Sequence, residues 1–246
     1  MHSITFHNLT LGYERHPAVH HLSGVFEPGS MTAVVGPNGS GKSTLLKGLT
    51  GILHPLGGHI DRGGLRADQI AYLPQQLEID RSFPITVLDI VILGLWHDIG
   101  MFGGMTPDLW KKVEQALTTV GLEGFEKRAI SNLSGGQFQR VMFARMLLQD
   151  SPVVVLDEPF TSIDEQTTLD LFKVVQRWHA ENRTIIAVLH DFDQVRAYFP
   201  QTLLIARELV GWGSTRQVLT EENLLSSRRM SEAWDESAEI CQENEI

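Results

Sequence analysis

The sequence predicts an α/β fold: a parallel sheet with an antiparallel edge and an inserted helical subdomain. Three short apolar runs, at 31–35, 153–156 and 184–189, are typical of buried parallel strands. The first run leads into a glycine-rich loop and an expected helix from Lys42 to Leu49 that ends near Gly51. Polar residues follow directly after each of the other two runs. Strands that alternate with helical segments favour a parallel sheet.

The remaining strands are expected at the edges of this core. Residues 3–11 and 19–27 mostly alternate apolar and polar side chains, which indicates two antiparallel edge strands. Pro28 and Gly29 predict a turn into the strand at 31–35. Residues 53–64, rich in Gly, Pro and His, are expected to form a surface turn. Residues 69–73 are expected to form a short buried strand.

Residues 76–150 are predicted to be mostly helical and to lie between strands of the core. The apolar stretch 86–97 predicts one helix, and Val141 to Gln149 another. A third helix begins at Thr106 and Pro107, because Thr suits the N-cap and Pro the first helical position. One face of that helix repeats at helical spacing through Leu109, Val113, Leu117 and Val120.

Composition restricts the class of protein. The chain has 246 residues, no apolar run near the length of a membrane span, and no visible signal peptide. Its single cysteine, Cys241, fits a reducing compartment, and we expect a cytoplasmic chain. The net charge of −10 argues against a nucleic-acid partner. Residues 1–228 are expected to form one domain, and 229–246 a solvated acidic tail.

The glycine-rich loop at 36–44 matches the phosphate-binding pattern G-x-x-x-x-G-K-[ST]. Its glycines allow several N–H groups to point inward, and the helix after it offers unpaired N–H groups to an anion. Lys42 is expected to reach the β- and γ-phosphates, and the Ser43 hydroxyl to hold Mg²⁺. A glycine-rich turn that carries a lysine by chance is disfavoured, because strand, loop and helix are all present. The loop alone does not distinguish kinases, GTPases, helicases and transport ATPases.

Polar residues at later strand ends complete a candidate site. The strand at 153–156 leads into Asp157, placed to coordinate Mg²⁺, and Glu158, placed to polarise a water molecule. The strand at 184–189 leads into His190, which by itself is better interpreted as a histidine facing solvent. Tyr13, at the end of the first strand, could stack on adenine, although a tyrosine at the edge of the core is the simpler interpretation.

One further motif gives these features a family. Residues 133–137 read Leu-Ser-Gly-Gly-Gln, and with the phosphate loop, residues 154–159 and His190 they occur in the order found in ATP-binding cassette (ABC) transport ATPases. The chain resembles this family over nearly its whole length. The resemblance implies Tyr13 as the adenine-stacking aromatic and Gln75 as a glutamine that touches Mg²⁺ and the attacking water. It also implies Asp157 as the Mg²⁺-linked carboxylate, Glu158 as the general base and His190 as the γ-phosphate sensor.

The expected site residues follow from the motifs and the resemblance together. The catalytic residues are Glu158, His190, Gln75 and Lys42, and the Mg²⁺ ligands are Ser43, Gln75 and Asp157. The remaining contacts to ATP are expected from Tyr13, Gly36, Pro37, Asn38, Gly39, Ser40, Gly41, Thr44, Ser134, Gly135, Gly136, Gln137 and Asp164. At Asp164 the sequence departs from the commonest family wording, with Ser-Ile-Asp in place of Ala-Leu-Asp, which leaves that loop's geometry open.

The resemblance also implies partners. In the family two cassettes close head to tail, so that Ser134, Gly135 and Gly136 of one copy cap the ATP of another. A serine hydroxyl and glycine N–H groups at the start of a helix form an anion site, which agrees with this arrangement. We therefore expect an ATP-dependent homodimer. The helical insertion at 76–150 is expected to contact an integral membrane permease, with the chain peripheral at the cytoplasmic face of the membrane.

Residues 73–94 are similar to the corresponding region of ATPases that drive zinc, manganese or iron import, mainly through Asp80, Phe83, Pro84, Thr86 and Val87. The implied function is ATP hydrolysis that drives import of a divalent metal ion, delivered to the permease by a binding protein. A soluble ATPase of iron–sulfur cluster assembly and an importer of another cargo stay open as alternatives. The ten histidines suggest a metal sensor, but His16, His20 and His21 lack a completing ligand.

Overall fold

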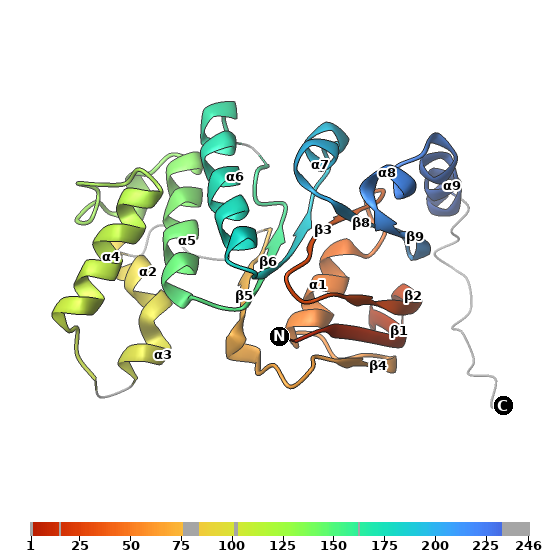
Figure 1. Cartoon of the computed structure of the whole chain (residues 1–246), viewed down its shortest axis with the longest axis horizontal. Helices are drawn as coiled ribbons and strands as arrows, with labels where there is room; N and C mark the ends of the chain where they lie inside the picture. Colours follow the sequence, from red (N-terminus) through yellow and green to blue (C-terminus); the bar gives the residue numbers. More distant parts are fainter. Residues whose placement is uncertain (1, 15, 76–83, 101–102, 162, 233–246) are drawn as a thin grey trace.

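A six-stranded sheet forms the centre of the protein in a computed structural model, which describes residues 2–14, 16–75, 84–100, 103–161 and 163–232 (Figure 1). The strand order is β5-β6-β7-β3-β8-β9. All neighbouring pairs are parallel except β8 and β9. The strands are β3 (Met31–Val35), β5 (Ile70–Leu73), β6 (Val153–Asp157), β7 (Thr184–Val188), β8 (Gln201–Ala206) and β9 (Glu208–Ser214). The predicted parallel core is confirmed.

A separate three-stranded antiparallel sheet has the order β2-β1-β4. Its strands are β1 (Ile4–Tyr13), β2 (His16–Phe26) and β4 (Gly57–Asp61). The interpretation of β1 as an edge strand is wrong, because β4 pairs along its other side. Residues 57–61 were expected in a turn, yet pairing with β1 makes them a strand. At Gly58 a Cβ would lie 2.3 Å from the carbonyl oxygens of β1, so only glycine permits this approach.

Two hydrophobic cores cover the two faces of the central sheet. On one face, α1 (Lys42–Thr50) packs between the six-stranded sheet and the antiparallel sheet, and its leucines join Val34 and Phe6 in one buried cluster. As predicted, α1 ends next to Gly51, which caps it with a left-handed backbone. The other face is covered by α5 (Gly135–Gln149), α6 (Glu165–Ala180) and α7 (Phe192–Tyr198). The helices α8 (Thr215–Val218) and α9 (Glu221–Glu232) follow the last strands.

The insertion lies at one end of the molecule, at the left of Figure 1. It contains α2 (Val87–Ile92), a 3-10 turn (Leu93–Leu95), α3 (Trp96–Ile99), α4 (Pro107–Thr119) and α5. The predicted start of α4 is confirmed, because the Thr106 hydroxyl accepts a hydrogen bond from the Leu109 N–H. The single helix expected at 86–97 is interrupted by the 3-10 turn, and α5 begins six residues before Val141.

Several expectations fall on residues outside the described ranges. They include Asp80 and Phe83 of the region similar to metal importers, and residues 233–246 of the acidic tail. The helix α9 runs without interruption across the domain boundary expected at 228. Among the residues that the structure describes, none of the helices is both long enough and apolar enough to span a bilayer.

Candidate functional site

The loop between β3 and α1 forms the floor of a pocket of about 690 Å³. Gly41 fixes the loop at its junction with the helix, since its φ is +91° and a Cβ there would lie 2.4 Å from the Ala18 carbonyl oxygen. Residues from three other strand ends reach the same pocket. Its lining consists of Ala18, Asn38, Gly39, Gly41, Lys42, Ser43, Thr44, Gln75, Glu158 and His190. The fold thus brings the predicted phosphate loop together with three residues predicted from distant motifs.

Lys42 is the first residue of α1, and its ammonium group turns back to the backbone of the loop. Its Nζ donates hydrogen bonds to the carbonyl oxygens of Gly36 at 2.9 Å and Pro37 at 2.8 Å. Burial lowers the pKa of Lys42, and the negative charges of Glu158 and Asp157 act in the opposite direction. A buried cation among loop N–H groups is suited to bind the negative charge of a polyphosphate.

Asp157, at the end of β6, is a buried carboxylate that accepts two hydroxyl hydrogen bonds. Ser43 Oγ donates to Oδ1 at 3.1 Å, and Tyr72 Oη lies 3.5 Å from Oδ2. Burial raises the pKa of Asp157, and the bond from Ser43 partly offsets this rise. A hydroxyl and a carboxylate that meet beside a phosphate loop are hard oxygen donors, the ligand type that Mg²⁺ prefers. These two residues therefore fit the predicted ion.

Glu158 and His190 are in direct contact. His190 Nε2 lies 2.6 Å from Glu158 Oε1, and the second carboxylate oxygen accepts a bond from Thr161 Oγ1 at 3.3 Å. The Glu158 side chain is only 10% exposed, whereas that of His190 is 41% exposed. Glu158 also has a positive φ of +50°, which is uncommon for a residue with a side chain. This backbone turn directs its carboxylate over the pocket instead of continuing β6.

Tyr13 lies at the end of β1 and is 48% exposed. Lys47 on α1 contacts it in two ways: its Nζ lies 3.3 Å from the Tyr13 hydroxyl and 5.8 Å from the ring centre. Tyr13 does not line the phosphate pocket. A solvent-exposed ring with a cation on one side can accept another flat group, which is compatible with stacking on adenine. The stacking role of Tyr13 stays a prediction.

The motif at 133–137 lies apart from the phosphate pocket. Ser134 is the N-cap of α5: its hydroxyl accepts from the Gln137 N–H at 3.2 Å, and the Gln137 side chain accepts from the Ser134 N–H at 3.0 Å. Gly135 and Gly136 form the first turn of α5. Asp164 caps α6 and accepts from the Thr167 N–H at 2.8 Å, which lowers its pKa. None of these residues lines the pocket in this chain.

Two residues of this region were missed by sequence reasoning. Tyr72 on β5 reaches Asp157, and Lys47 reaches Tyr13. Desolvation by burial is the main cause that raises the pKa of Tyr72, so its hydroxyl stays a proton donor at any physiological pH. The only available signal was positional: Tyr72 lies on the strand that leads to Gln75, and Lys47 lies about one helical turn after Ser43.

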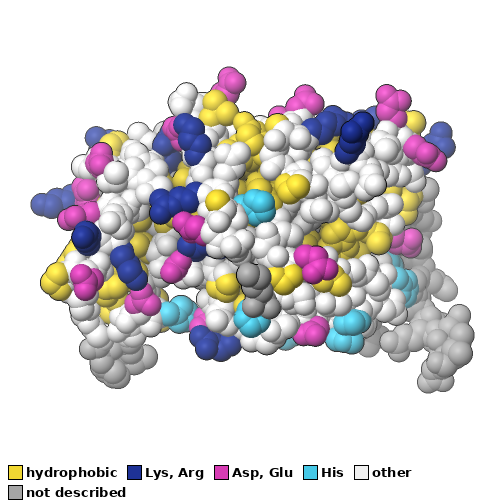
Figure 2. Space-filling model, viewed as in Figure 1, with side chains coloured by type: hydrophobic (Ala, Val, Ile, Leu, Met, Phe, Trp, Pro, Cys, Tyr) yellow, Lys and Arg dark blue, Asp and Glu magenta, His cyan; other side chains and the backbone are white. Residues whose placement is uncertain are grey.

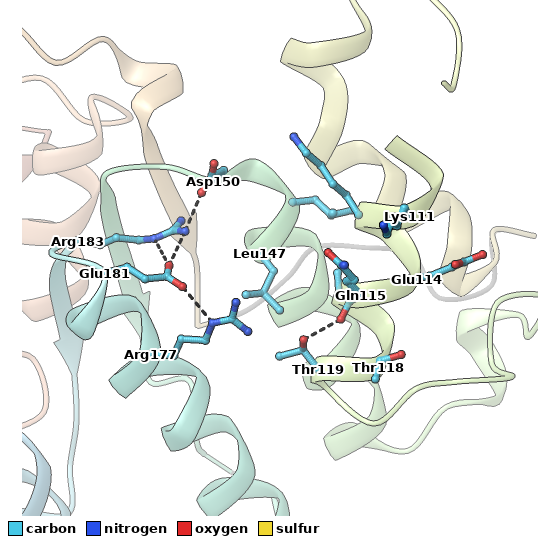
Figure 3. A pocket seen from close by; sticks show the side chains of 13 residues that line it. Lys111, Glu114, Gln115, Thr118, Thr119, Leu147, Asp150, Arg177, Glu181 and Arg183 are labelled. Atoms are coloured by element: carbon cyan, nitrogen blue, oxygen red, sulfur yellow. Dashed lines mark hydrogen bonds and ion pairs between the residues drawn. The ribbon is translucent and has the colours of Figure 1, made fainter. Parts of the chain in front are cut away.

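A second, larger cleft of about 750 Å³ lies between α4 and the C-terminal ends of α5 and α6. Figure 3 shows that several of its charged side chains pair with one another. Arg183 contacts both Asp150 and Glu181 at 2.7 and 2.8 Å, and Arg177 contacts Glu181 at 3.0 Å. None of the predicted site residues lines this cleft. We therefore place the candidate site at the phosphate loop despite its smaller volume.

The histidines do not assemble into a metal centre within the described part of the chain, where no group of three His, Cys, Asp or Glu is close enough to hold an ion. His20 is buried and His21 is exposed, as expected for neighbours on a strand. On the face shown in Figure 2, basic and acidic side chains lie interspersed.

Comparison with known proteins places these observations in context. The ABC transporter family matches residues 19–161, more than half of the chain. The manganese transport system ATP-binding protein MntB of Listeria monocytogenes is 38% identical over 220 residues, which cover 88% of this chain and 92% of that protein. The manganese transport system ATP-binding protein MntA of Synechocystis is 35% identical over 228 residues, 90% of this chain and 85% of that protein.

Two solved structures of ABC proteins have the same fold as this chain. A metal-chelate type ABC transporter in an inward-facing conformation superposes with a TM-score of 0.81 at 30% identity, covering 93% of this chain and 90% of that chain. The ATP-binding cassette MJ1267 in its ADP conformation superposes with a TM-score of 0.78 at 21% identity, covering 93% and 99% of the two chains. At that identity the second similarity concerns the fold alone.

Proposed function

The chain belongs to the ABC transporter family, and from this membership we propose that it is the ATP-hydrolysing subunit that drives transport of a divalent metal ion. The observation that carries the proposal is the pocket that joins Lys42, Gln75, Glu158 and His190. A cation for phosphate and a carboxylate for water lie in one cavity, as ATP hydrolysis requires.

The loop residues and Lys42 would bind the phosphates of ATP. Lys42 exchanges its two bonds to loop carbonyl oxygens for bonds to the β- and γ-phosphates, which carry more charge. Ser43, Asp157 and Gln75 would hold Mg²⁺, which neutralises charge on the phosphates. Tyr13 would stack on the adenine ring, and the loop N–H groups would bind the remaining phosphate oxygens.

Glu158 would accept a proton from the water that attacks the γ-phosphorus, as the bond from the γ-phosphorus to the oxygen of ADP breaks. In this structure Glu158 Oε1 lies within 2.6 Å of His190 Nε2. When a γ-phosphate oxygen enters the pocket, it offers His190 a second acceptor. A His190 side chain that turns to this oxygen leaves Glu158 free to bind the water.

A second copy of the chain would complete the site. Ser134, Gly135, Gly136 and Gln137 start a helix whose first N–H groups suit an anion, but they lie outside this chain's own pocket. We propose that these residues and Asp164 contact the ATP held by a partner copy, in an ATP-dependent homodimer. This arrangement would couple ATP binding to closure and hydrolysis to opening.

We propose manganese, or another divalent metal such as zinc, as the cargo, because the relatives reported above are named for manganese transport. Residues 1–228 would form the nucleotide-binding domain, with the insertion at 76–150 against an integral membrane permease at the cytoplasmic face. A metal-binding protein would deliver the ion to that permease. The alternative in iron–sulfur cluster assembly has no support among these relatives.

Metal uptake tests the proposal. In a strain that lacks this chain, wild type is expected to restore manganese uptake and Lys42→Ala to fail, while Lys173→Ala, an exposed lysine on α6 and outside the insertion, serves as the matched control. Purified Lys42→Ala should also lose ATP binding. Restoration of uptake by Lys42→Ala at wild-type protein level contradicts the proposal. Co-purification with a soluble iron–sulfur scaffold instead of a membrane protein contradicts the transport role.

A further inference from the structure

We propose that Tyr72 is a positioning residue that orients the Asp157 carboxylate for the divalent cation bound with ATP. The inference rests on the proposed function, because it concerns the same pocket. It assigns a specific task to a side chain that lies in none of the motifs described above.

The fold fixes the position of the Tyr72 ring. β5 and β6 are parallel neighbours, with Tyr72 opposite Val155, two residues before Asp157. The ring packs against the hydrophobic cluster that contains α1 and the inner residues of the sheet. From this position its hydroxyl lies 3.5 Å from Asp157 Oδ2. A rigid ring held by core packing restricts its hydroxyl far more than a flexible side chain would.

The two oxygens of Asp157 have different donors. Ser43 Oγ donates to Oδ1 at 3.1 Å, and Tyr72 approaches Oδ2. Among the described residues, these two side chains are the donors to this carboxylate. Ser43 is itself a proposed ligand, so its hydroxyl oxygen would turn to the cation. Tyr72 would then be the side chain that still fixes the plane of the carboxylate and directs Oδ1 toward the ion.

Such a task belongs to the residues around the ligands of a metal ion, which restrict ligand orientation and thereby raise affinity. Removal of such a partner commonly weakens metal binding about tenfold or more. Because the contact here is long, we expect a smaller effect, about three- to tenfold. The effect should appear only when a divalent cation is present.

Nucleotide affinity with and without a divalent cation isolates this task. The dissociation constant of ATP is measured for wild type and Tyr72→Phe, once with Mg²⁺ and once with EDTA. The ratio of the two constants reports the coupling between ion and nucleotide. Tyr72→Phe is expected to reduce that coupling about three- to tenfold and to leave the affinity in EDTA unchanged. Tyr198→Phe removes a hydroxyl from a ring stacked on Phe172 and is the matched control.

A double-mutant cycle with Asp157→Asn separates orientation from general stability. If Tyr72 acts through the carboxylate, Tyr72→Phe should have no further effect in the Asp157→Asn background. Two results would each overturn the inference. The first is that Tyr72→Phe weakens ATP binding equally in Mg²⁺ and in EDTA, and the second is that it reduces the coupling just as much in the Asp157→Asn background. Wild type without any Mg²⁺ effect would also overturn it, together with the Mg²⁺ part of the proposed function. Wild-type coupling that persists unchanged in Tyr72→Phe refutes the inference alone.

Discussion

Two glycines of the phosphate loop should respond very differently to the same substitution. Gly39 and Gly41 both have left-handed backbones, with φ of +76° and +91°. A Cβ at Gly39 meets no atom within 4 Å, whereas a Cβ at Gly41 lies 2.4 Å from the Ala18 carbonyl oxygen and 2.6 Å from a Val19 methyl group. Gly39→Ala therefore tests backbone strain, and Gly41→Ala tests strain together with a steric clash.

The losses of stability expected for the two variants follow from these contacts. A left-handed backbone at alanine costs about 1–2 kcal/mol, and alanine regains about 0.4–1 kcal/mol by restricting the unfolded chain. Gly39→Ala should thus lower the free energy of unfolding by about 1 kcal/mol. At Gly41 the clash with β2 adds about 1–3 kcal/mol, because a backbone carbonyl cannot rotate away. We expect a total loss of about 2–4 kcal/mol for Gly41→Ala.

Urea unfolding of the two variants, without nucleotide, measures the difference directly. The midpoint for Gly41→Ala should fall well below that for Gly39→Ala while the slope stays the same. Because Ala18 also lines the pocket, the shift of β2 in Gly41→Ala should weaken ATP binding as well. Equal midpoints for the two variants would refute the reasoning, since they would mean that the contact between β2 and the loop relaxes freely.

Three further results are expected. Glu158→Gln should keep ATP binding and lower the rate of ATP hydrolysis at least about a hundredfold. With MgATP it should elute as a dimer in size-exclusion chromatography, and a monomer that binds ATP contradicts the proposed dimer. Ser134→Ala should lower the free energy of unfolding by about 1 kcal/mol and weaken that dimer without altering ATP affinity of the monomer. The contacts from Lys173 and Arg140 lower the pKa of Asp170 to about 2 from 3.8, so the stability they add is present above pH 4 and disappears as pH falls through 2. Because the Asp170 side chain is 32% exposed, Asp170→Asn should lower the free energy of unfolding by only about 1 kcal/mol at pH 7. Thermal unfolding should show almost no loss near pH 2, and an equal loss at both pH values contradicts the pairing.

The elements that sequence predicted best are those whose side chains determine them locally. The buried strands β3, β6 and β7 are apolar runs, and α4 begins at a Thr-Pro cap. By contrast, β4 contains Gly57 and Gly58 and becomes a strand only through pairing with β1, which no local pattern indicates. The early start of α5 was missed because Gly135 and Gly136 disfavour helix interiors. The reciprocal bonds between Ser134 and Gln137 offset this preference.

In the site, too, sequence predicted the features that depend on local residues and missed those that depend on contacts between distant strands. The phosphate loop could be identified from nine consecutive residues, because its backbone conformation depends on its own glycines. The contact between Glu158 and His190 could not, because it requires β6 and β7 to be neighbours although α6 separates them in the chain. Tyr72 was missed for a similar reason: its partner, Asp157, lies on a strand that is adjacent in space and 85 positions away in sequence.

The contacts of the pocket also bear on how strongly ATP can bind. Lys42 donates to two carbonyl oxygens, and Glu158 pairs with His190. A triphosphate therefore exchanges existing interactions for new ones, and its net binding energy is the difference between them. Phosphate oxygens carry full charge and carbonyl oxygens do not, so Lys42 favours the exchange. Separation of Glu158 from His190 opposes it. In the proposed dimer, an additional contribution from Ser134 of the second copy would then decide when the site closes, and this would couple hydrolysis to assembly of the pair.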